Sequence, residues 1–190
     1  MTKIAIIVGS TRPGRGEAVA RWVQGIARQC TEADYEIVDI ADYDLPDPDE
    51  PAPPSRAEGR RPRTQAWAEK IGSFDGYVFV TPEYNHPVSG ALKSAIDVPD
   101  TEWHNKAAGF VTYGIGGGPC SVANLRLIMT ELQIADVQAQ VALSLYTDFT
   151  DLVDFTPAAH RADAVACLLG QVVGWSTALA SLRSADRGTE

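Results

Sequence analysis

The chain has 190 residues and a mass of 20.4 kDa, close to the length of one typical domain of roughly 150 residues. Its apolar fraction of 45% and charged fraction of 22% exclude a disordered chain, a collagen-like repeat and a disulfide-stapled miniprotein. Sixteen basic and twenty-five acidic residues give a net charge of −9, which disfavours nucleic acid and anionic membranes as partners. We therefore expect one folded domain over residues 1–190.

The cysteines and the N-terminal residues indicate where such a protein resides. Cys30, Cys120 and Cys167 are odd in number and far apart, which fits neither a disulfide framework nor the clustered ligands of a zinc site. The chain has no apolar run near the ~18 residues of a spanning helix, and the run after Met1 is too short for a signal peptide. We expect a cytoplasmic protein without a metal site.

Short apolar runs alternate along the chain with amphipathic segments. The apolar runs are typical of buried strands, the last with the alternation of an edge strand, and they span residues 4–8, 35–40, 77–80, 107–113 and 137–143. Helical periodicity marks residues 17–27, 64–74, about 92–96 and 122–132. A last helix is expected from an N-cap at Thr156, followed by Pro157, to about residue 182.

This order predicts an α/β fold with a parallel sheet covered by helices on both faces. Residues 42–62 interrupt it with six of the twelve prolines, and this irregular crossing is either a binding lid or a surface excursion. In such folds ligands lie beyond the carboxyl ends of the strands. The chemistry is therefore expected in the loops after the first, third and fourth strands.

The loop after the first strand, Gly9 to Gly16, has the composition of an anion site. Backbone N–H groups, hydroxyls, Arg12 and Arg15 converge at a helix N-terminus, where a phosphate monoester would fit. It is not a Walker A loop, because Arg15 and Gly16 stand where lysine and Ser/Thr are needed, and Thr11 breaks the dinucleotide fingerprint. The alternative is an ordinary turn with solvated arginines.

The loop after the third strand, residues 81–90, is stiffened by two prolines and offers a flat aromatic face at Tyr84 and an amide at Asn85. A planar heterocycle could pack there. We expect Glu83 to accept backbone N–H groups rather than to act as an acid. His86 is expected to be solvated or bonded within the loop, because no cysteine and no second histidine lies near it in the sequence.

The loop after the fourth strand, Tyr113 to Pro119, is rich in glycine, so its backbone can approach a ligand and present N–H groups to a carbonyl or a developing anion. Cys120 follows in the first turn of a helix. We interpret it as a small buried residue, the alternative being a thiol activated by the helix dipole.

Together these segments resemble the NADPH-dependent FMN reductase family. The resemblance rests on G-S-T-R-P-G-R, on P-E-Y-N-H followed by S-G-A-L-K-S-A-I-D, and on Y-G-x-G-G-G. It implies a flavodoxin-like three-layer α/β/α sandwich, a five-stranded parallel sheet of order 2-1-3-4-5, bound FMN, and a homodimer or homotetramer. The chain departs from the family's usual residues at Pro119-Cys120 and at His86-Pro87.

The resemblance also assigns site residues. By it, the phosphate would be held by Ser10, Arg12 and Arg15 and by backbone groups of Gly16, Glu17 and Ala18. The isoalloxazine ring would be bordered on one side by Pro82, Glu83, Tyr84 and Asn85, and on the other by Tyr113, Gly114 and Gly117. No residue is assigned as a catalytic acid or base, since the flavin carries the chemistry.

The implied activity is that of an oxidoreductase. Hydride would pass from NADPH or NADH to bound FMN and then to an acceptor: free flavin, a quinone, an azo compound or a metal oxyanion. Two alternatives keep the same fold, namely a flavodoxin-type electron carrier, which a charge of −9 would suit, and a non-catalytic interaction protein.

Overall fold

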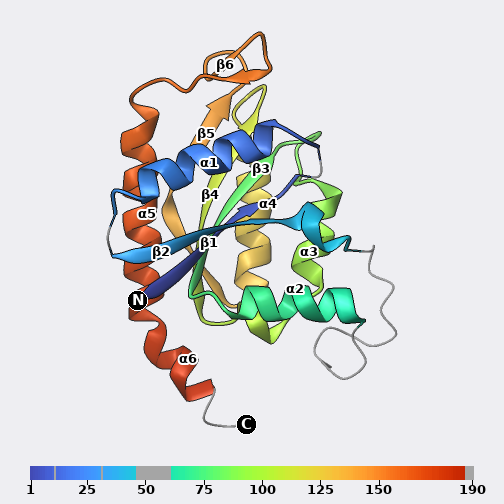
Figure 1. Cartoon of the computed structure of the whole chain (residues 1–190), viewed down its shortest axis with the longest axis vertical. Coiled ribbons are helices and arrows are strands. Elements are labelled where there is room, and N and C mark those ends of the chain that lie inside the picture. Colours follow the sequence, from blue (N-terminus) through green and yellow to red (C-terminus); the bar gives the residue numbers. More distant parts are fainter. Residues whose placement is uncertain (11, 31, 46–60, 187–190) are drawn as a thin grey trace.

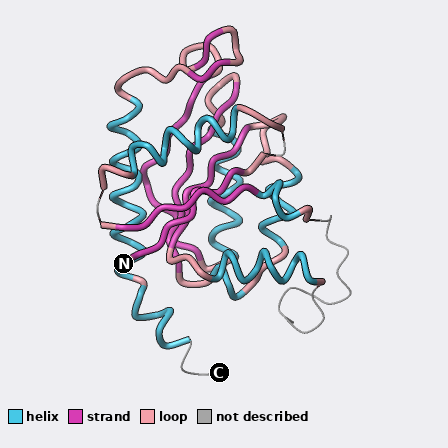
Figure 2. The backbone as a smooth tube through the Cα atoms, viewed as in Figure 1, coloured by secondary structure: helices cyan, strands magenta, loops and turns pink. Residues whose placement is uncertain are grey.

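The elements follow the expected alternation of strands and helices (Figures 1 and 2). The structure, a computed structural model, describes residues 1–10, 12–30, 32–45 and 61–186, so most of the expected irregular crossing lies outside the described residues. The elements of the central sheet and its connections are β1 (Thr2–Val8), α1 (Arg15–Ala27), β2 (Ala33–Asp39), a 3-10 turn (Ile40–Tyr43), α2 (Pro62–Gly72), β3 (Gly76–Pro82), α3 (Gly90–Asp97), a second 3-10 turn (Thr101–Trp103), β4 (Lys106–Gly114), α4 (Pro119–Glu131) and β5 (Ile134–Ser144). They are followed by β6 (Phe149–Thr150), β7 (Asp154–Phe155), α5 (Arg161–Ala178) and α6 (Ala180–Asp186).

The five long strands form one parallel sheet of order β2-β1-β3-β4-β5, which confirms the expected fold class and strand order. β1 pairs with β2 on one side and with β3 on the other, so that Ile6 lies between Ile37 and Val78. β5 is an edge strand, and its burial alternates as the sequence predicted. Because all five strands run the same way, their carboxyl ends meet at one edge of the sheet.

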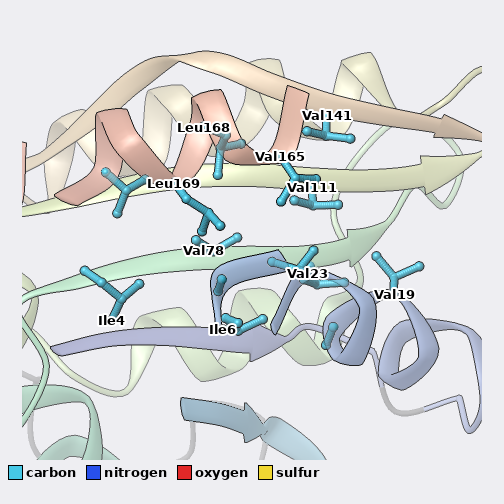
Figure 3. Close-up of a cluster of buried hydrophobic side chains, with 14 of the residues drawn as sticks. Ile4, Ile6, Val19, Val23, Val78, Val111, Val141, Val165, Leu168 and Leu169 are labelled. Atoms are coloured by element: carbon cyan, nitrogen blue, oxygen red, sulfur yellow. The ribbon is translucent and has the colours of Figure 1, made fainter. Parts of the chain in front are cut away.

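Helices cover both faces of the sheet and enclose a separate apolar core on each (Figure 1). On one face α1 and α5 pack over the sheet, and Figure 3 shows Val19 and Val23 of α1 and Leu168 of α5 directed towards Ile6, Val78 and Val111. On the other face α2, α3 and α4 enclose a core that includes Trp67 and Phe79. Full burial of each such side chain contributes about 1.5–3 kcal/mol, so both faces stabilise the sheet that carries the loops.

The C-terminal part differs from the prediction. The last helix begins at Arg161 rather than at Thr156 and ends at Ala178, and a short helix then starts at Ala180. Thr156 is not an N-cap: its N–H donates to the carbonyl of Asp148 over 3.0 Å, and its hydroxyl pairs with that of Thr150. The segment before it forms the β6–β7 hairpin, which the sequence analysis missed and which lies beyond the end of β5 (Figure 1).

The apolar stripe expected on the last helix is buried only in its first half. Val165, Leu168 and Val172 are fully buried, whereas Trp175 and Leu182 are about half exposed. Within the described residues, no helix is both long and apolar enough to cross a membrane.

Candidate functional site

A cavity of about 620 Å³ opens where the carboxyl ends of the strands meet the N-terminus of α1. This volume lies within the range of small-molecule sites, about 300–1,000 Å³. Its walls come from the loop after β1 with the first turn of α1, the loop after β3, the loop after β4, Leu145 directly after β5, and the β6–β7 hairpin. The three loops are those that the sequence singled out, and the hairpin is the addition that the fold makes.

The loop after β1 gives the cavity a cationic end. Gly14 precedes α1 with φ of +99°, a conformation that glycine adopts easily and that lets the helix begin at Arg15. Arg12 and Arg15 line the cavity, and among the described residues neither guanidinium is paired with a carboxylate. The N–H groups of the first helical turn add their partial positive charge. This end of the cavity therefore favours a dianion such as a phosphate monoester.

Ser10 and Tyr113 form a buried polar pair at this end. Ser10 is only 4% exposed, and its hydroxyl accepts the N–H of Arg12 over 3.2 Å. Burial raises the pKa of Tyr113 to about 12, although a hydrogen bond with Ser10 acts in the opposite direction. Tyr113 is therefore a neutral phenol at any working pH, and it can donate or accept a hydrogen bond but adds no negative charge near a phosphate.

The loop after β3 is held to the N-terminus of α4 by the carboxylate of Glu83. Its Oε2 atom accepts the N–H groups of Cys120 over 2.8 Å and of Ser121 over 3.1 Å. This is the backbone-accepting role that the sequence predicted for Glu83, and the contact also places negative charge at the positive end of a helix. The Ser121 hydroxyl donates to the carbonyl of Pro87, which fixes the far end of the same loop.

The aromatic face of this loop is turned towards the cationic end. The guanidinium of Arg12 lies 4.9 Å from the centre of the Tyr84 ring, within the range of a cation–π contact. Ser89 ties the loop to the first one, because its hydroxyl donates to the carbonyl of Gly9 over 2.8 Å and accepts the N–H of Leu92 at the start of α3. The two loops are thus held in one arrangement.

The glycine-rich loop contributes Gly114 and Ile115 to the cavity. Gly117 is placed differently from the expectation: it is buried against Ala142, and its N–H donates to the carbonyl of Gly114 over 3.1 Å. Its own carbonyl accepts the hydroxyl of Thr112. The positive φ of Gly117, +82°, serves this internal turn rather than an approach to a ligand.

The remaining wall comes from Leu145, Val153, Asp154 and Phe155, which the sequence analysis did not identify. The hairpin is anchored by the fully buried carboxylate of Asp148, which accepts Arg161 Nε and Nη2 over 3.1 and 3.0 Å. Burial alone would raise the pKa of Asp148, but hydrogen bonds from Arg161, Thr147 and the Ala158 N–H outweigh it and lower the pKa. Phe155 also packs edge-on against Trp22 of α1.

Most of the expected site residues are brought together in this cavity. Those that line it are Ser10, Arg12, Arg15, Ala18, Pro82, Glu83, Tyr84, Tyr113 and Gly114. Those that do not are Gly16, Glu17, Asn85 and Gly117. Gly16 is packed beneath the Tyr113 hydroxyl and Val8, and the Glu17 carboxylate turns to Arg21 at 2.6 Å, so only their backbone groups can serve the cavity. Asn85 is exposed in the left-handed region, at φ of +52°.

The donor set and the shape of the cavity fit a flavin mononucleotide. Two guanidinium groups, a buried hydroxyl and a helix N-terminus suit the phosphate, and the apolar side chains of Ile115, Leu145 and Val153 suit a ring system. At Gly16, a Cβ atom would come within 3.1 Å of the Tyr113 hydroxyl, a tight contact, so this part of the phosphate end favours a glycine. These features define a mononucleotide-binding protein of the flavodoxin-like class.

The sequence comparisons identify the family within that class. Residues 2–148 match the family model described as NADPH-dependent FMN reductase. An NAD(P)H-dependent FMN reductase of a Nectria species, ntnL, is 34% identical over 159 residues, which cover 78% of this chain and 79% of that protein. A Schizosaccharomyces pombe protein of the same description is 37% identical over 150 residues, covering 77% and 74%. The chain therefore belongs to the NADPH-dependent FMN reductase family.

Other similar proteins agree with this membership. A quinone reductase of Escherichia coli is 36% identical over 137 residues, covering 68% of this chain and 70% of that protein. The solved structure of FerB, an NAD(P)H:(acceptor) oxidoreductase from Paracoccus denitrificans, shares the fold with a TM-score of 0.72 at 18% identity and covers 93% of this chain and 98% of that one. The expected family is confirmed, and with it the class of enzyme, an FMN-dependent oxidoreductase.

Proposed function

We propose that the chain binds FMN in the 620 Å³ cavity and transfers hydride from NADPH or NADH, through the flavin, to a small-molecule acceptor. The observation that carries this proposal is the convergence of Arg12, Arg15 and Ser10 at the N-terminus of α1, next to the loop that presents Tyr84. A site for a dianionic tail beside a site for a flat ring is the pattern that a mononucleotide with a large heterocycle requires.

The phosphate would be held by the cationic end of the cavity. Arg12 and Arg15 supply charge-assisted hydrogen bonds, and the first-turn N–H groups, including those of Gly16 and Glu17, have no partner inside the helix. The Ser10 hydroxyl and Ala18 form the rest of this end of the cavity. Since the net charge of the chain is −9, this local positive field also distinguishes the site from the rest of the surface.

The ring would lie between the loop after β3 and the loop after β4. Pro82, Glu83 and Tyr84 border it on one side, and Tyr113 and Gly114 on the other. Asn85 and Gly117 would support these loops from outside the cavity. The apolar wall of Leu145, Val153 and Phe155 would exclude water from the ring.

Bound FMN supplies the hydride chemistry, so the protein's task is to bind, orient and shield. Glu83 contributes by fixing the loop after β3 to α4, and Tyr113 by remaining neutral beside the phosphate end. The acceptor is a free flavin, a quinone, an azo compound or a metal oxyanion. A quinone reductase among the similar proteins supports the quinone class.

We further propose one domain over residues 1–190, a homodimer or homotetramer, and a cytoplasmic location. The half-exposed Trp175 on α5 supports an oligomer because it leaves a large apolar side chain on the surface. The three free cysteines support a reducing compartment.

The test replaces both arginines. In the Arg12→Ala/Arg15→Ala double variant, we expect the FMN dissociation constant to rise at least about 100-fold, since each charge-assisted contact contributes about 1.5–3 kcal/mol. Arg28→Ala, an exposed arginine just after α1, is the matched control and should bind FMN like the unaltered chain. Fluorescence titration of FMN measures both. Unchanged affinity in the double variant would contradict the proposal.

An anaerobic absorption spectrum separates the enzyme from the carrier. Bleaching of the flavin bands on addition of NADPH or NADH supports the reductase. Bound flavin whose bands persist would indicate an electron carrier, and a chain that neither binds FMN nor gains thermal stability from it would indicate an interaction protein.

A further inference from the structure

Three potential metal ligands of different chemical types converge beside the cavity. One carboxylate oxygen of Glu83, a ring nitrogen of His86 and the sulfur of Cys120 all lie within 4.8 Å of one another. His86 Nδ1 and Cys120 Sγ are 3.2 Å apart, although the two residues are separated by 34 positions in the sequence. No cysteine lies near His86 in the sequence, and the fold brings Cys120 to it.

Each of the three groups is held in place by the backbone. The loop after β3 places His86 at φ of +82°, a left-handed conformation that costs a non-glycine residue about 1–3 kcal/mol and that the surrounding loop has to hold in place. Cys120 lies in the first turn of α4, whose start is fixed by the contact of Glu83 with its N–H. The imidazole and the thiol therefore face each other because two separate elements are clamped together.

The carboxylate is already oriented for a further partner. Glu83 Oε2 accepts the N–H groups of Cys120 and Ser121, while among the described residues Oε1 accepts no hydrogen bond. In metal sites, a carboxylate ligand is oriented in this way: one oxygen accepts hydrogen bonds from the protein, and the other faces the metal. Glu83 borders the cavity, whereas His86 and Cys120 do not line it, so the cluster lies on the outer side of this wall.

We propose that Glu83, His86 and Cys120 form a binding site for a divalent transition metal, with Zn²⁺ the best match. Thiolate, imidazole and carboxylate are the three ligand types that zinc takes, and tetrahedral zinc separates its ligand atoms by roughly 3.3–3.6 Å. The His86–Cys120 pair, at 3.2 Å, is already near this separation, and the Glu83 carboxylate lies within 4.8 Å of both. Mg²⁺ and Ca²⁺, which take oxygen ligands, do not fit.

Binding would involve one change of protonation and leave one position open. The Cys120 thiol releases its proton to solvent as the sulfur–metal bond forms. Three protein ligands leave the fourth position to water, and His86 is exposed, so a metal can enter from solvent. The bound metal would connect the loop after β3 to α4, and we expect it to raise the melting temperature. This site does not depend on the proposed flavin chemistry.

The experiment titrates the full chain, with FMN present and with its thiols reduced by a phosphine, with Cd²⁺ and then with Zn²⁺ as competitor. We expect one Cd²⁺ per chain, thiolate-to-metal absorption in the near ultraviolet, and displacement by Zn²⁺. Cys120→Ser should abolish the absorption. His86→Asn, which keeps a residue that tolerates a positive φ, should weaken binding at least about tenfold, the loss caused by removing even an outer-shell partner.

The chain offers a matched control for each variant. Cys167→Ser alters another free cysteine and His160→Asn another exposed histidine, and both should bind Cd²⁺ like the unaltered chain. If circular dichroism shows that Cys120→Ser does not fold, the proposal is tested by Cd²⁺ binding to His86→Asn and to its control, His160→Asn. The proposal would be overturned if His86→Asn bound Cd²⁺ as tightly as the unaltered chain does. Loss of Cd²⁺ binding in a control variant, or the absence of stoichiometric Cd²⁺ binding by the unaltered chain, would also overturn it. FMN titrations of the same variants show separately whether the flavin site is intact.

Discussion

Both ends of the central strands carry cationic side chains, but the partners of these cations differ: the cations at the amino end are buried, whereas at the carboxyl end Arg12 is exposed and Arg15 half-buried. At the amino end, Lys106 is 4% exposed and donates to the carbonyls of Ile71 and Gly72 and to the Tyr77 hydroxyl, over 2.9–3.2 Å. Arg183 likewise reaches Asp75 at 3.0 Å. At the carboxyl end, Arg12 and Arg15 line a cavity and have no carboxylate partner among the described residues.

We interpret this contrast as one between cations that serve stability and cations that are proposed to bind the phosphate. A buried cation needs acceptors from the protein itself, and the amino end supplies them from the end of α2 and from β3. Burial also raises the pKa of Tyr77 well above its usual value, so this phenol stays neutral and donates in turn to Ile71. At the carboxyl end no carboxylate among the described residues pairs with Arg12 or Arg15, which is the property expected of a site for an anion.

The largest effect should follow from changing the amino end. Lys106→Met leaves buried acceptors without their donor, and we expect it to reduce the free energy of unfolding by about 2–3 kcal/mol while the FMN affinity of the folded protein is unchanged. Urea denaturation and FMN titration measure the two effects. Lys93→Met, which removes only an exposed ion pair with Asp97, is the control and should cost less than about 0.5 kcal/mol. A large loss of FMN affinity in Lys106→Met would contradict the separation of the two ends.

The next effect concerns the anchor of the β6–β7 hairpin. Asp148→Asn should reduce stability by about 2 kcal/mol at neutral pH, because charge-assisted hydrogen bonds to Arg161 are lost. The folded pKa of Asp148 is lowered, so its contribution is present above the unfolded value of about 3.9 and is lost as the pH falls through the folded value. Denaturation curves from about pH 6 to about pH 3 should therefore show a smaller loss of stability in the variant than in the unaltered chain. Equal losses would exclude Asp148 as a source of the acid sensitivity.

A smaller effect is expected where the first two loops are joined. Ser89→Ala removes the N-cap of α3 and the contact with Gly9, which should cost about 1 kcal/mol of stability. Because Gly9 is the first residue of the loop that carries Arg12 and Arg15, FMN affinity should also fall, by a few fold. Ser73→Ala, at the exposed end of α2, should change neither quantity by a comparable amount. A Ser89→Ala variant with full stability would show that the contact contributes little.

The smallest effect tests the neutral phenol of the carboxyl end. Tyr113→Phe loses the hydrogen bond with Ser10 but no charge, so FMN affinity should fall by less than about tenfold. With a pKa of about 12, the phenol should produce no change in FMN affinity between about pH 6 and about pH 9. If FMN affinity changed with pH in this range and the change were absent in Tyr113→Phe, Tyr113 would not be a neutral phenol there.

The sequence predicted the sheet and the three loops because each depends on local signals. Strands such as residues 4–8 are buried on both faces and read as apolar runs, and glycine and proline mark the turns that follow them. The β6–β7 hairpin escaped prediction because strands of two residues have no periodicity. Thr156-Pro157 imitates a helix start, and only the tertiary contact of Thr156 with Asp148 shows otherwise.

The details of the site depended on contacts between distant residues. The accepting role of Glu83 followed from its place in a stiff loop, but its partners, the N–H groups of Cys120 and Ser121, could not be identified from spacing. Gly117 was expected at the ligand. The loop instead turns inward there, because Gly117 packs against Ala142 of the next strand. The nearness of His86 and Cys120 has no signal within either segment alone.

The β6–β7 hairpin differs from the other walls of the cavity because it lies outside the part of the chain that matches the family model. The family match ends at residue 148, and Val153, Asp154 and Phe155 follow it. The segment adds no strand to the main sheet and is joined to the body of the protein by the Asp148–Arg161 ion pair, by Phe149 in the core and by Phe155 against Trp22. The other lining residues, from Ser10 to Leu145, all lie within the match, so we expect members of the family to differ in the shape of the pocket first at this hairpin.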